Sequence, residues 1–297
     1  MSTVAIGVDV GGTKTHLAAL DDSGRRRDVI IASSEWRRGE LFGEPDNLRR
    51  LASWVKSTAQ PSDLTPMVMG IRDCDSPTEI TDATARLQAA LGQYVRVEND
   101  ADLLGPAAGL EESIALVVGT GAIVSGRRAS GERVTADGYG WLLGDWGSAP
   151  TLIRCALQRL LTSYDVDDHP DLILAGYLFA HFGAHDPVTL ASLATAQPSA
   201  SLWGDAAPLL FAALSEGSPI AREVIDISAT KIATGIESVH RRGAAGIDVI
   251  AAGGVITSQA ALQEAVRREL ATAVPQLRLS VLTVPPVDGA LRLASTW

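Results

Sequence analysis

The chain of 297 residues has little of several features that would define its class. Its two cysteines, Cys74 and Cys155, are too few for a disulfide framework and too far apart for a zinc knuckle or a Cys-x-x-Cys redox pair. The sequence has no uncharged apolar run of about 18 residues and no readable signal peptide. We therefore expect a cytoplasmic protein with no membrane contact.

Positive charge is scarce as well. The chain carries 25 basic and 35 acidic residues, which gives a net charge of −10. Its longest basic run, Arg25 to Arg27, follows Ser23-Gly24, and we interpret it as a solvated hairpin tip. Proteins that bind nucleic acid neutralise phosphates with a basic surface, so no nucleic-acid partner is expected.

The hydrophobic pattern predicts an α/β fold in which strands alternate with helices. A strand, a Gly/Thr turn and a second strand open the chain, and the same signal returns about 110 residues later. This pattern is also compatible with chance similarity. We predict two domains, 1–110 and 111–297, with a helical insertion in the second over 150–242. The last helix, 287–294, either stays with the second domain or packs back on the first.

Three turns of small residues follow apolar strands, and each could bind an anion. They are Gly11-Gly12-Thr13, Gly119-Thr120-Gly121 and Gly253-Gly254. Glycines let backbone N–H groups converge on a phosphate, and a threonine hydroxyl adds a donor. Each turn alone is equally compatible with an ordinary tight turn. Neither a P-loop nor a three-glycine dinucleotide pattern is present, which disfavours GTPases and dehydrogenases.

Two carboxylates end predicted strands beside these turns. Asp9 lies inside an apolar strand and could hold the water shell of Mg²⁺, or it could cap its own turn. Asp100 follows Asn99 at a strand-to-helix junction, where it could act as a general base for a substrate hydroxyl or as part of a helix N-cap.

The segment 137–149 is rich in glycine and contains Trp141 and Trp146 beside Asp145. Aromatic rings pack on the C–H faces of sugars and carboxylates bind sugar hydroxyls, so this composition suits a carbohydrate site. The alternative is a glycine-rich loop whose tryptophans fill the core. The apolar interval 175–213 is core or a dimer interface, and we expect a homodimer.

Taken in order, several short motifs resemble the N-acetylglucosamine kinase group, which includes the BadF/BadG/BcrA/BcrD-type ATPases of the actin, Hsp70 and sugar kinase superfamily. The motifs are Asp9 to Thr15, Asn99-Asp100-Ala101, Gly119 to Ala122, Gly140 to Ala149, Ala252 to Val255 and Pro286 to Ala290. The resemblance implies two actin-like (ribonuclease H-like) domains, each a mixed sheet with helices, and a nucleotide cleft between them. It also implies ATP and Mg²⁺ as cofactors and a sugar as the substrate.

The resemblance assigns a role to each motif. Asp100 matches the catalytic base that deprotonates a sugar hydroxyl, expected to be the 6-hydroxyl, and Asp9 organises Mg²⁺. It assigns the nucleotide to Gly11, Gly12, Thr13, Lys14, Gly119, Thr120, Gly121, Gly253 and Gly254. It assigns the sugar to Asn99, Asp145, Trp146 and Asp73.

Three departures from the group's pattern keep other functions open. Trp146 stands where the group has a glutamate in Gly-Asp-Glu-Gly-Ser, Ala122 stands for a serine, and Arg72-Asp73 replaces small residues. The first hypothesis is an ATP-dependent amino-sugar kinase. The second is a regulatory protein that binds nucleotide or sugar without turnover. The third is a dehydratase-activating ATPase with an iron–sulfur cluster, although Cys74 and Cys155 lack a cluster-binding neighbourhood.

Overall fold

The computed structural model describes residues 3–166, 170–196 and 198–296, which form two compact units. One unit comprises residues 1–111 together with 282–297, and the other comprises residues 112–281. Each unit contains one five-stranded mixed sheet. The domain boundary at residues 110 and 111 stays a prediction.

The sheet of the first unit has the strand order β3-β2-β1-β4-β5. The three N-terminal strands pair antiparallel, and β4 and β5 extend the sheet in parallel from β1. The strands are β1 (Thr3–Val10), β2 (Lys14–Asp21), β3 (Arg26–Ala32), β4 (Met67–Ile71) and β5 (Arg96–Glu98). The helical elements are η1 (Ser33–Glu35), α1 (Asn47–Ala59), α2 (Pro77–Leu91), η2 (Asp100–Leu103), α3 (Leu104–Ala108) and α12 (Val287–Ser295).

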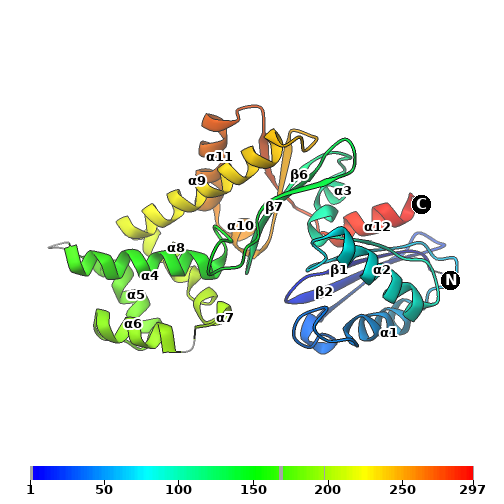
Figure 1. Cartoon of the computed structure of the whole chain (residues 1–297), viewed down its shortest axis with the longest axis horizontal. Coiled ribbons are helices and arrows are strands. Elements are labelled where there is room, and N and C mark those ends of the chain that lie inside the picture. The colour runs from blue at the N-terminus through cyan, green and yellow to red at the C-terminus, as the bar shows by residue number, and fades with distance from the viewer. Residues whose placement is uncertain (1–2, 167–169, 197, 297) are drawn as a thin grey trace. The chain divides into compact units, whose positions relative to one another are not determined.

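Both faces of this sheet are covered, because alternate residues of a strand point to opposite sides. Ile6, Val8 and Val10 of β1 pack in one core with α1 and α2, whereas Ala5 belongs to a second core with α12 (Figure 1). Gly7 also faces α12, and a Cβ at this position would collide with the backbone of Leu291. The glycine therefore permits close packing of α12 on β1.

The basic run between β2 and β3 is exposed, as predicted, and one of its arginines also forms ion pairs. Arg26 begins β3, and its guanidinium lies 2.7 Å from Asp28 and 2.7 Å from Asp288 of α12. The predicted solvent exposure of the run is confirmed, and the ion-pair partners of Arg26 come from a neighbouring strand position and from the far end of the sequence.

The second unit repeats the strand arrangement of the first. Its order is β10-β9-β6-β7-β8, with β6, β7 and β8 antiparallel and with β9 and β10 parallel to β6. The strands are β6 (Ile114–Val118), β7 (Ala122–Arg127), β8 (Arg133–Asp137), β9 (Asp248–Ala252) and β10 (Arg278–Val281). The duplicated α/β pattern predicted from the sequence is confirmed.

The long connection between β8 and β9 is helical, as predicted, and supplies most of the core of this unit. Helix α9 packs on β7 and β8 and also contacts α4 and α11 (Figure 1). The helices are α4 (Ala149–Val166), α5 (Leu172–Phe182), α6 (Pro187–Ala196), α7 (Ala200–Gly204), α8 (Ala207–Ser215), α9 (Pro219–Arg241), α10 (Gly254–Ser258) and α11 (Ala260–Ala273). Among the described residues, no helix is both long enough and apolar enough to cross a membrane.

Candidate active site

Asp9 is a buried carboxylate near the carboxyl end of β1. Its residue is 8% exposed, and its strand neighbours are His16 of β2 and Gly70 of β4. Burial and the negative charge of Asp100 raise the pKa of Asp9 to about 7, against a smaller opposing effect of Lys14. A carboxylate this poorly solvated gains from a nearby cation, so its surroundings fit the predicted divalent ion.

The turn after β1 exposes donors suited to an anion. The N–H of Gly11 donates to the carbonyl of Lys14 at 3.0 Å and closes the hairpin. Within the described part of the chain, no backbone hydrogen bond uses the N–H of Gly12 or of Thr13. Lys14 is exposed at the start of β2. Two amides, a hydroxyl and an ammonium group thus occupy one short segment, as phosphate binding requires.

Ser33 holds this turn in place. Its N–H donates to the carbonyl of Thr13 at 2.9 Å, and its hydroxyl donates to the carbonyl of Gly11 at 2.8 Å. The same hydroxyl lies 3.0 Å from the hydroxyl of Thr15, which accepts a hydrogen bond from the Trp36 indole. These bonds occupy the carbonyls of the turn, so its amides are the groups left to meet a ligand.

Asn99 positions Asp100 at the start of η2. Its side-chain oxygen accepts from the N–H of Ala101 at 3.0 Å, and its amide donates to the carbonyl of Cys74 and to the carboxylate of Asp75. The N-cap role that sequence left open is therefore played by Asn99. Asn99 is 2% exposed, and its predicted contact with a substrate remains a prediction.

In the first unit, the loop after β4 lies beside the end of β1. The N–H of Arg72 donates to the carbonyl of Val10 at 2.9 Å, so the loop begins against the end of β1. Asp73 has a left-handed backbone with φ 72°, and its carboxylate accepts from the guanidinium of Arg37 at 2.5 Å. The structure thus brings Asp9, the 11–14 turn, Asp73 and the Asn99-Asp100 junction to neighbouring strand ends of one unit.

In the second unit the two remaining glycine turns contact each other. A Cβ on Gly119 would lie 3.3 Å from the backbone nitrogen of Gly254, and a Cβ on Gly253, which has φ 107°, would lie 2.5 Å from the carbonyl oxygen of Val118. The N–H of Gly119 donates to the carbonyl of Gly121 at 2.8 Å. Residues that are about 130 positions apart in the sequence therefore form one glycine-rich surface within the unit.

The 137–149 loop is tied to that surface by its backbone. The N–H of Ala149 donates to the carbonyl of Gly119 at 2.8 Å. Asp137, with φ 65°, accepts from the N–H groups of Asp145 and Trp146 at 2.8 and 2.7 Å. Asp145 is 8% exposed, and its carboxylate accepts from the N–H of Gly140 at 3.0 Å. Two of the predicted sugar residues, Asp145 and Trp146, thus lie on a loop held by Asp137.

Two cationic side chains lie over the ring of Trp146. The ring centroid is 5.7 Å from the Arg154 guanidinium carbon and 5.5 Å from the Lys231 ammonium nitrogen. Cation–π attraction of this kind contributes about 0.5 to 2 kcal/mol, depending on desolvation. Trp141 instead packs edge-on against Trp203 in the core, with ring centroids 5.0 Å apart, so the two tryptophans of the loop have different roles.

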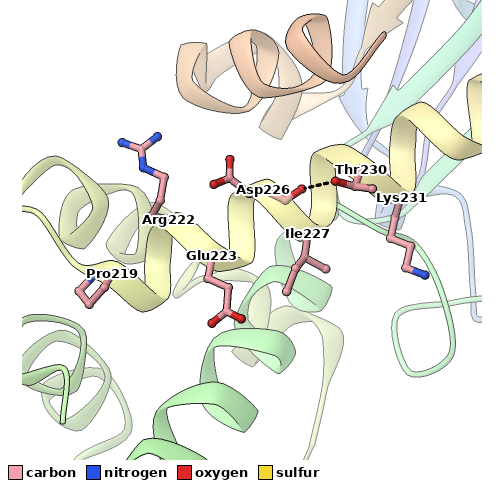
Figure 2. A pocket seen from close by; sticks show the side chains of 7 residues that line it. All are labelled: Pro219, Arg222, Glu223, Asp226, Ile227, Thr230 and Lys231. Atoms are coloured by element: carbon pink, nitrogen blue, oxygen red, sulfur yellow. Dashed lines mark hydrogen bonds between the residues drawn. The ribbon is translucent and has the colours of Figure 1, made fainter. Parts of the chain in front are cut away.

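A shallow groove runs along α9, as Figure 2 shows. It has a volume of about 540 Å³ and is lined by Pro219, Arg222, Glu223, Asp226, Ile227, Thr230 and Lys231. None of the site residues predicted from sequence is among these seven, and one of the seven, Lys231, also lies over the Trp146 ring. Among the described residues, no group of three His, Cys, Asp or Glu side chains could hold a metal ion by itself.

Comparison with known proteins places the chain in a family. Residues 6–291 match the sequence model of the BadF/BadG/BcrA/BcrD ATPase family. The chain belongs to this family. A curated relative, the N-acetyl-D-glucosamine kinase of Dictyostelium discoideum, is 24% identical over 314 aligned residues, covering 98% of this chain and 97% of the relative.

Solved structures share the fold of this BadF/BadG/BcrA/BcrD ATPase family member. A protein of Chromobacterium violaceum, provisionally assigned as an N-acetylglucosamine kinase, matches with a TM-score of 0.70 and 19% identity over 99% of both chains. A ROK family glucokinase of Streptomyces griseus, solved with glucose and AMPPNP, matches with a TM-score of 0.59 and 18% identity over 99% of both chains. The predicted α/β fold of two actin-like domains is confirmed.

Three residues with no role assigned from sequence shape the candidate site of this family member. Ser33 locks the first turn, Arg72 lies over that turn, and Asp137 holds the 145–148 loop. No local pattern identifies Ser33. The Asp137-Gly138 pair does mark a left-handed turn, but it does not reveal which amides its carboxylate binds.

Proposed function

We propose that this protein is a sugar kinase that transfers the terminal phosphoryl group of ATP to an amino sugar of the N-acetylglucosamine or glucosamine type. The observation that carries the proposal is the placement of Asp9, the 11–14 turn and Asp100 at the carboxyl ends of β1 and β5, two parallel strands that flank β4 in the sheet of the first unit. Membership of an ATPase family and similarity to proteins named as sugar kinases support it.

Asp100 is proposed as the general base. Its carboxylate takes the proton of the acceptor hydroxyl, which we assign to carbon 6, as the hydroxyl oxygen attacks the γ-phosphorus. The new bond joins that oxygen to phosphorus, and the bond from phosphorus to the β–γ bridging oxygen breaks, so that ADP leaves with the electron pair. A positioned base typically contributes roughly 10² to 10⁴ in rate. Asn99 supports this role by fixing the N-terminus of η2.

The residues proposed to hold ATP and Mg²⁺ suit those groups chemically. In the first unit, Gly11, Gly12, Thr13 and Lys14 offer amides, a hydroxyl and a positive charge, and the buried Asp9 offers the carboxylate for the water shell of the ion. When bound, Mg²⁺ neutralises charge on the transferring phosphates. In the second unit, we assign a further phosphate contact to Gly119, Thr120 and Gly121 and the adenosine contact to Gly253 and Gly254.

The sugar contacts are assigned to Asp73, Asn99, Asp145 and Trp146. Both carboxylates of this set are held by hydrogen bonds, Asp73 by the guanidinium of Arg37 and Asp145 by the N–H of Gly140. Trp146 offers an aromatic face, which is already flanked by Arg154 and Lys231. An indole here favours packing on the sugar ring over a hydrogen bond.

Two other candidate functions would require different properties of these residues. Ala122 and Trp146 replace polar groups of the family pattern, so a nucleotide-binding or sugar-binding regulator without turnover is the second candidate. A cluster-bearing activator would need thiolate ligands. Burial and nearby carboxylates raise the pKa of Cys74 to about 12, and burial raises the pKa of Cys155, so both thiols are held in the protonated form.

We also propose a homodimer that uses the helical part of the second unit. Val188 and Leu193 of α6 are 79% and 41% exposed, and Leu172 at the start of α5 is 71% exposed. Apolar side chains of this size on neighbouring helices favour burial against a partner. Light scattering coupled to size exclusion should give the mass of two chains. A mass of one chain across micromolar concentrations contradicts the dimer.

The test of the proposed function is a coupled ADP-release assay. Glucosamine, N-acetylglucosamine, N-acetylmannosamine and glucose are each supplied with ATP and Mg²⁺, with a no-sugar control. ADP release should depend on one amino sugar, and Asp100→Asn should bind ATP like the wild type yet lose roughly 10² to 10⁴ of that rate. Wild-type binding of ATP without turnover of any sugar would favour the regulator. Full activity of Asp100→Asn would contradict the assignment of the base.

A further inference from the structure

The guanidinium of Arg72 lies beside Gly12 in the proposed first phosphate turn. It fills the space in which the Cβ of any other residue at position 12 would lie. A Cβ on Gly12 would collide with Nη1 of Arg72 and would lie 3.2 Å from its Cζ. Gly12 is not among the residues with a positive φ, so its backbone is open to any residue type. The close contact at this position is therefore with the far end of the arginine side chain and not with the backbone of the turn.

Several bonds fix the arginine at this place. Its N–H donates to the carbonyl of Val10 at 2.9 Å, one residue before the turn. Its Nε lies 3.7 Å from the carboxylate of Asp73, which also accepts from the guanidinium of Arg37. The N–H of Arg37 donates to the carbonyl of Ser33 at 2.8 Å. Arg72 and the turn are thus connected through Asp73, Arg37 and Ser33, because Ser33 also binds the turn.

This arrangement adds a positive charge to the donors already described. The amides of Gly12 and Thr13 take part in no backbone hydrogen bond of the described residues, and the Arg72 side chain remains 41% exposed and so can reach a ligand. A planar guanidinium presents donors that match two oxygens of a phosphate, and such charge-assisted bonds are stronger than neutral ones. The terminal phosphate of a nucleotide has more non-bridging oxygens and more negative charge than the phosphate before it.

We propose that the Arg72 guanidinium, seated over Gly12, binds the terminal phosphate of ATP and stabilises the phosphoryl group during its transfer. The inference rests on the proposed function for its catalytic part. Arg72 stays protonated throughout, while the acceptor proton goes to Asp100 and the electron pair of the broken bond leaves with ADP. A preorganised cation in this position lowers the barrier because charge spreads over the phosphoryl oxygens in the transition state.

The first test measures binding and requires no turnover. Titration calorimetry with the non-hydrolysable analogue AMPPNP and with ADP, each with Mg²⁺, compares the wild type with Arg72→Ala. We expect AMPPNP affinity to fall about 10- to 100-fold and ADP affinity to change less than about 3-fold. Arg49→Ala, which removes an exposed arginine of α1 in the same unit, is the matched control and should change neither affinity.

The second test measures catalysis on the sugar that the wild type accepts. Arg72→Ala should lower kcat about 100-fold or more with little change in the KM for sugar, and Arg72→Lys should keep part of the rate because it keeps the charge. Added guanidinium ion should restore part of the activity of Arg72→Ala and none to Asp100→Asn. A residue with a merely structural role would show no such rescue.

A third test uses the contact with Gly12 directly. Gly12→Ala should displace the guanidinium and weaken AMPPNP binding about as much as Arg72→Ala does. In the Arg72→Ala background the same change should cost less than about 3-fold, because the collision is gone. If the two substitutions lowered the affinity for AMPPNP independently, the fold-losses would multiply in the double variant. That result would contradict the proposed contact.

The outcomes separate this inference from the proposed function. Equal affinities of wild type and Arg72→Ala for AMPPNP, or equal losses for AMPPNP and ADP, would overturn the assignment of Arg72 to the terminal phosphate. A change confined to the KM for sugar would overturn it too and place Arg72 at the acceptor. If the wild type binds AMPPNP but phosphorylates no sugar, the proposed function fails, and the binding comparison still decides whether Arg72 holds the terminal phosphate.

Discussion

Replacing the buried carboxylate of Asp9 is expected to stabilise the nucleotide-free protein at pH 8 while abolishing magnesium-dependent nucleotide binding. The pKa of Asp9 is about 7 in the folded chain, against an ordinary value of 3.8. The folded state therefore retains a proton that the unfolded chain has already lost between these two pH values. Stability from this group is thus present below about pH 4 and is lost as the pH rises to about 7.

The magnitude follows from the size of the shift. A difference of about 3 pKa units corresponds to roughly 4 kcal/mol, most of which is the cost of ionising a buried group. At pH 5 only about a third of this destabilisation of the folded state is present. Asp9→Asn removes the ionisation, so its free energy of unfolding relative to the wild type should rise by about 2 to 3 kcal/mol between pH 5 and pH 8.

Urea denaturation of the nucleotide-free protein at pH 5 and at pH 8, followed by circular dichroism, measures this difference. Asp63→Asn, at an exposed carboxylate in the same unit, is the matched control and should give no comparable change between the two pH values. Because a cation beside Asp9 favours its ionised form, Mg²⁺ with ATP should stabilise the wild type more than Asp9→Asn. An Asp9→Asn protein that is destabilised equally at both pH values would refute the reasoning.

Three further substitutions test the framework around the site. Ser33→Ala removes the 2.8 Å bond to the carbonyl of Gly11 and should weaken ATP binding about 5- to 10-fold in calorimetry, with unchanged circular dichroism; unaltered affinity would mean that the turn holds itself. Asp137→Asn keeps the left-handed backbone but loses one of the two contacts with backbone N–H groups. The KM for sugar should therefore rise about tenfold with a smaller change in kcat. A fall in kcat alone would argue that Asp137 does not fix the loop. Gly253→Ala forces a Cβ to within 2.5 Å of the carbonyl of Val118 at φ 107°, so the free energy of unfolding should fall by about 3 kcal/mol in urea, and a fully stable variant would contradict this packing.

The fold could be predicted from sequence because its signals are local. The apolar strand that ends in Asp9, the glycines that follow it and the return of the same pattern at 114–127 all lie within short segments, and the structure repeats one strand order in both units. The long helical interval before β9 was predicted for the same reason, since its periodicity needs no knowledge of distant contacts.

The framework of the site could not be predicted, because it depends on contacts between segments far apart in sequence. Ser33 reaches back 22 residues to the carbonyl of Gly11, and Arg72 lies over a glycine 60 residues before it. Arg26 is exposed as expected, but its pairing with Asp288 from the other end of the chain could not be read from local sequence. Each of these side chains is polar and ordinary in its local sequence, and only the pairing of β1 with its neighbours gives it a role.

The most direct test of the central claim identifies the product itself. The protein is incubated with ATP, Mg²⁺ and each amino sugar, and phosphorus NMR and mass spectrometry follow the fate of the terminal phosphate. We expect one sugar phosphate ester, on carbon 6, for each ADP formed. ADP accompanied only by inorganic phosphate, or no ADP from a protein that binds ATP, would contradict it.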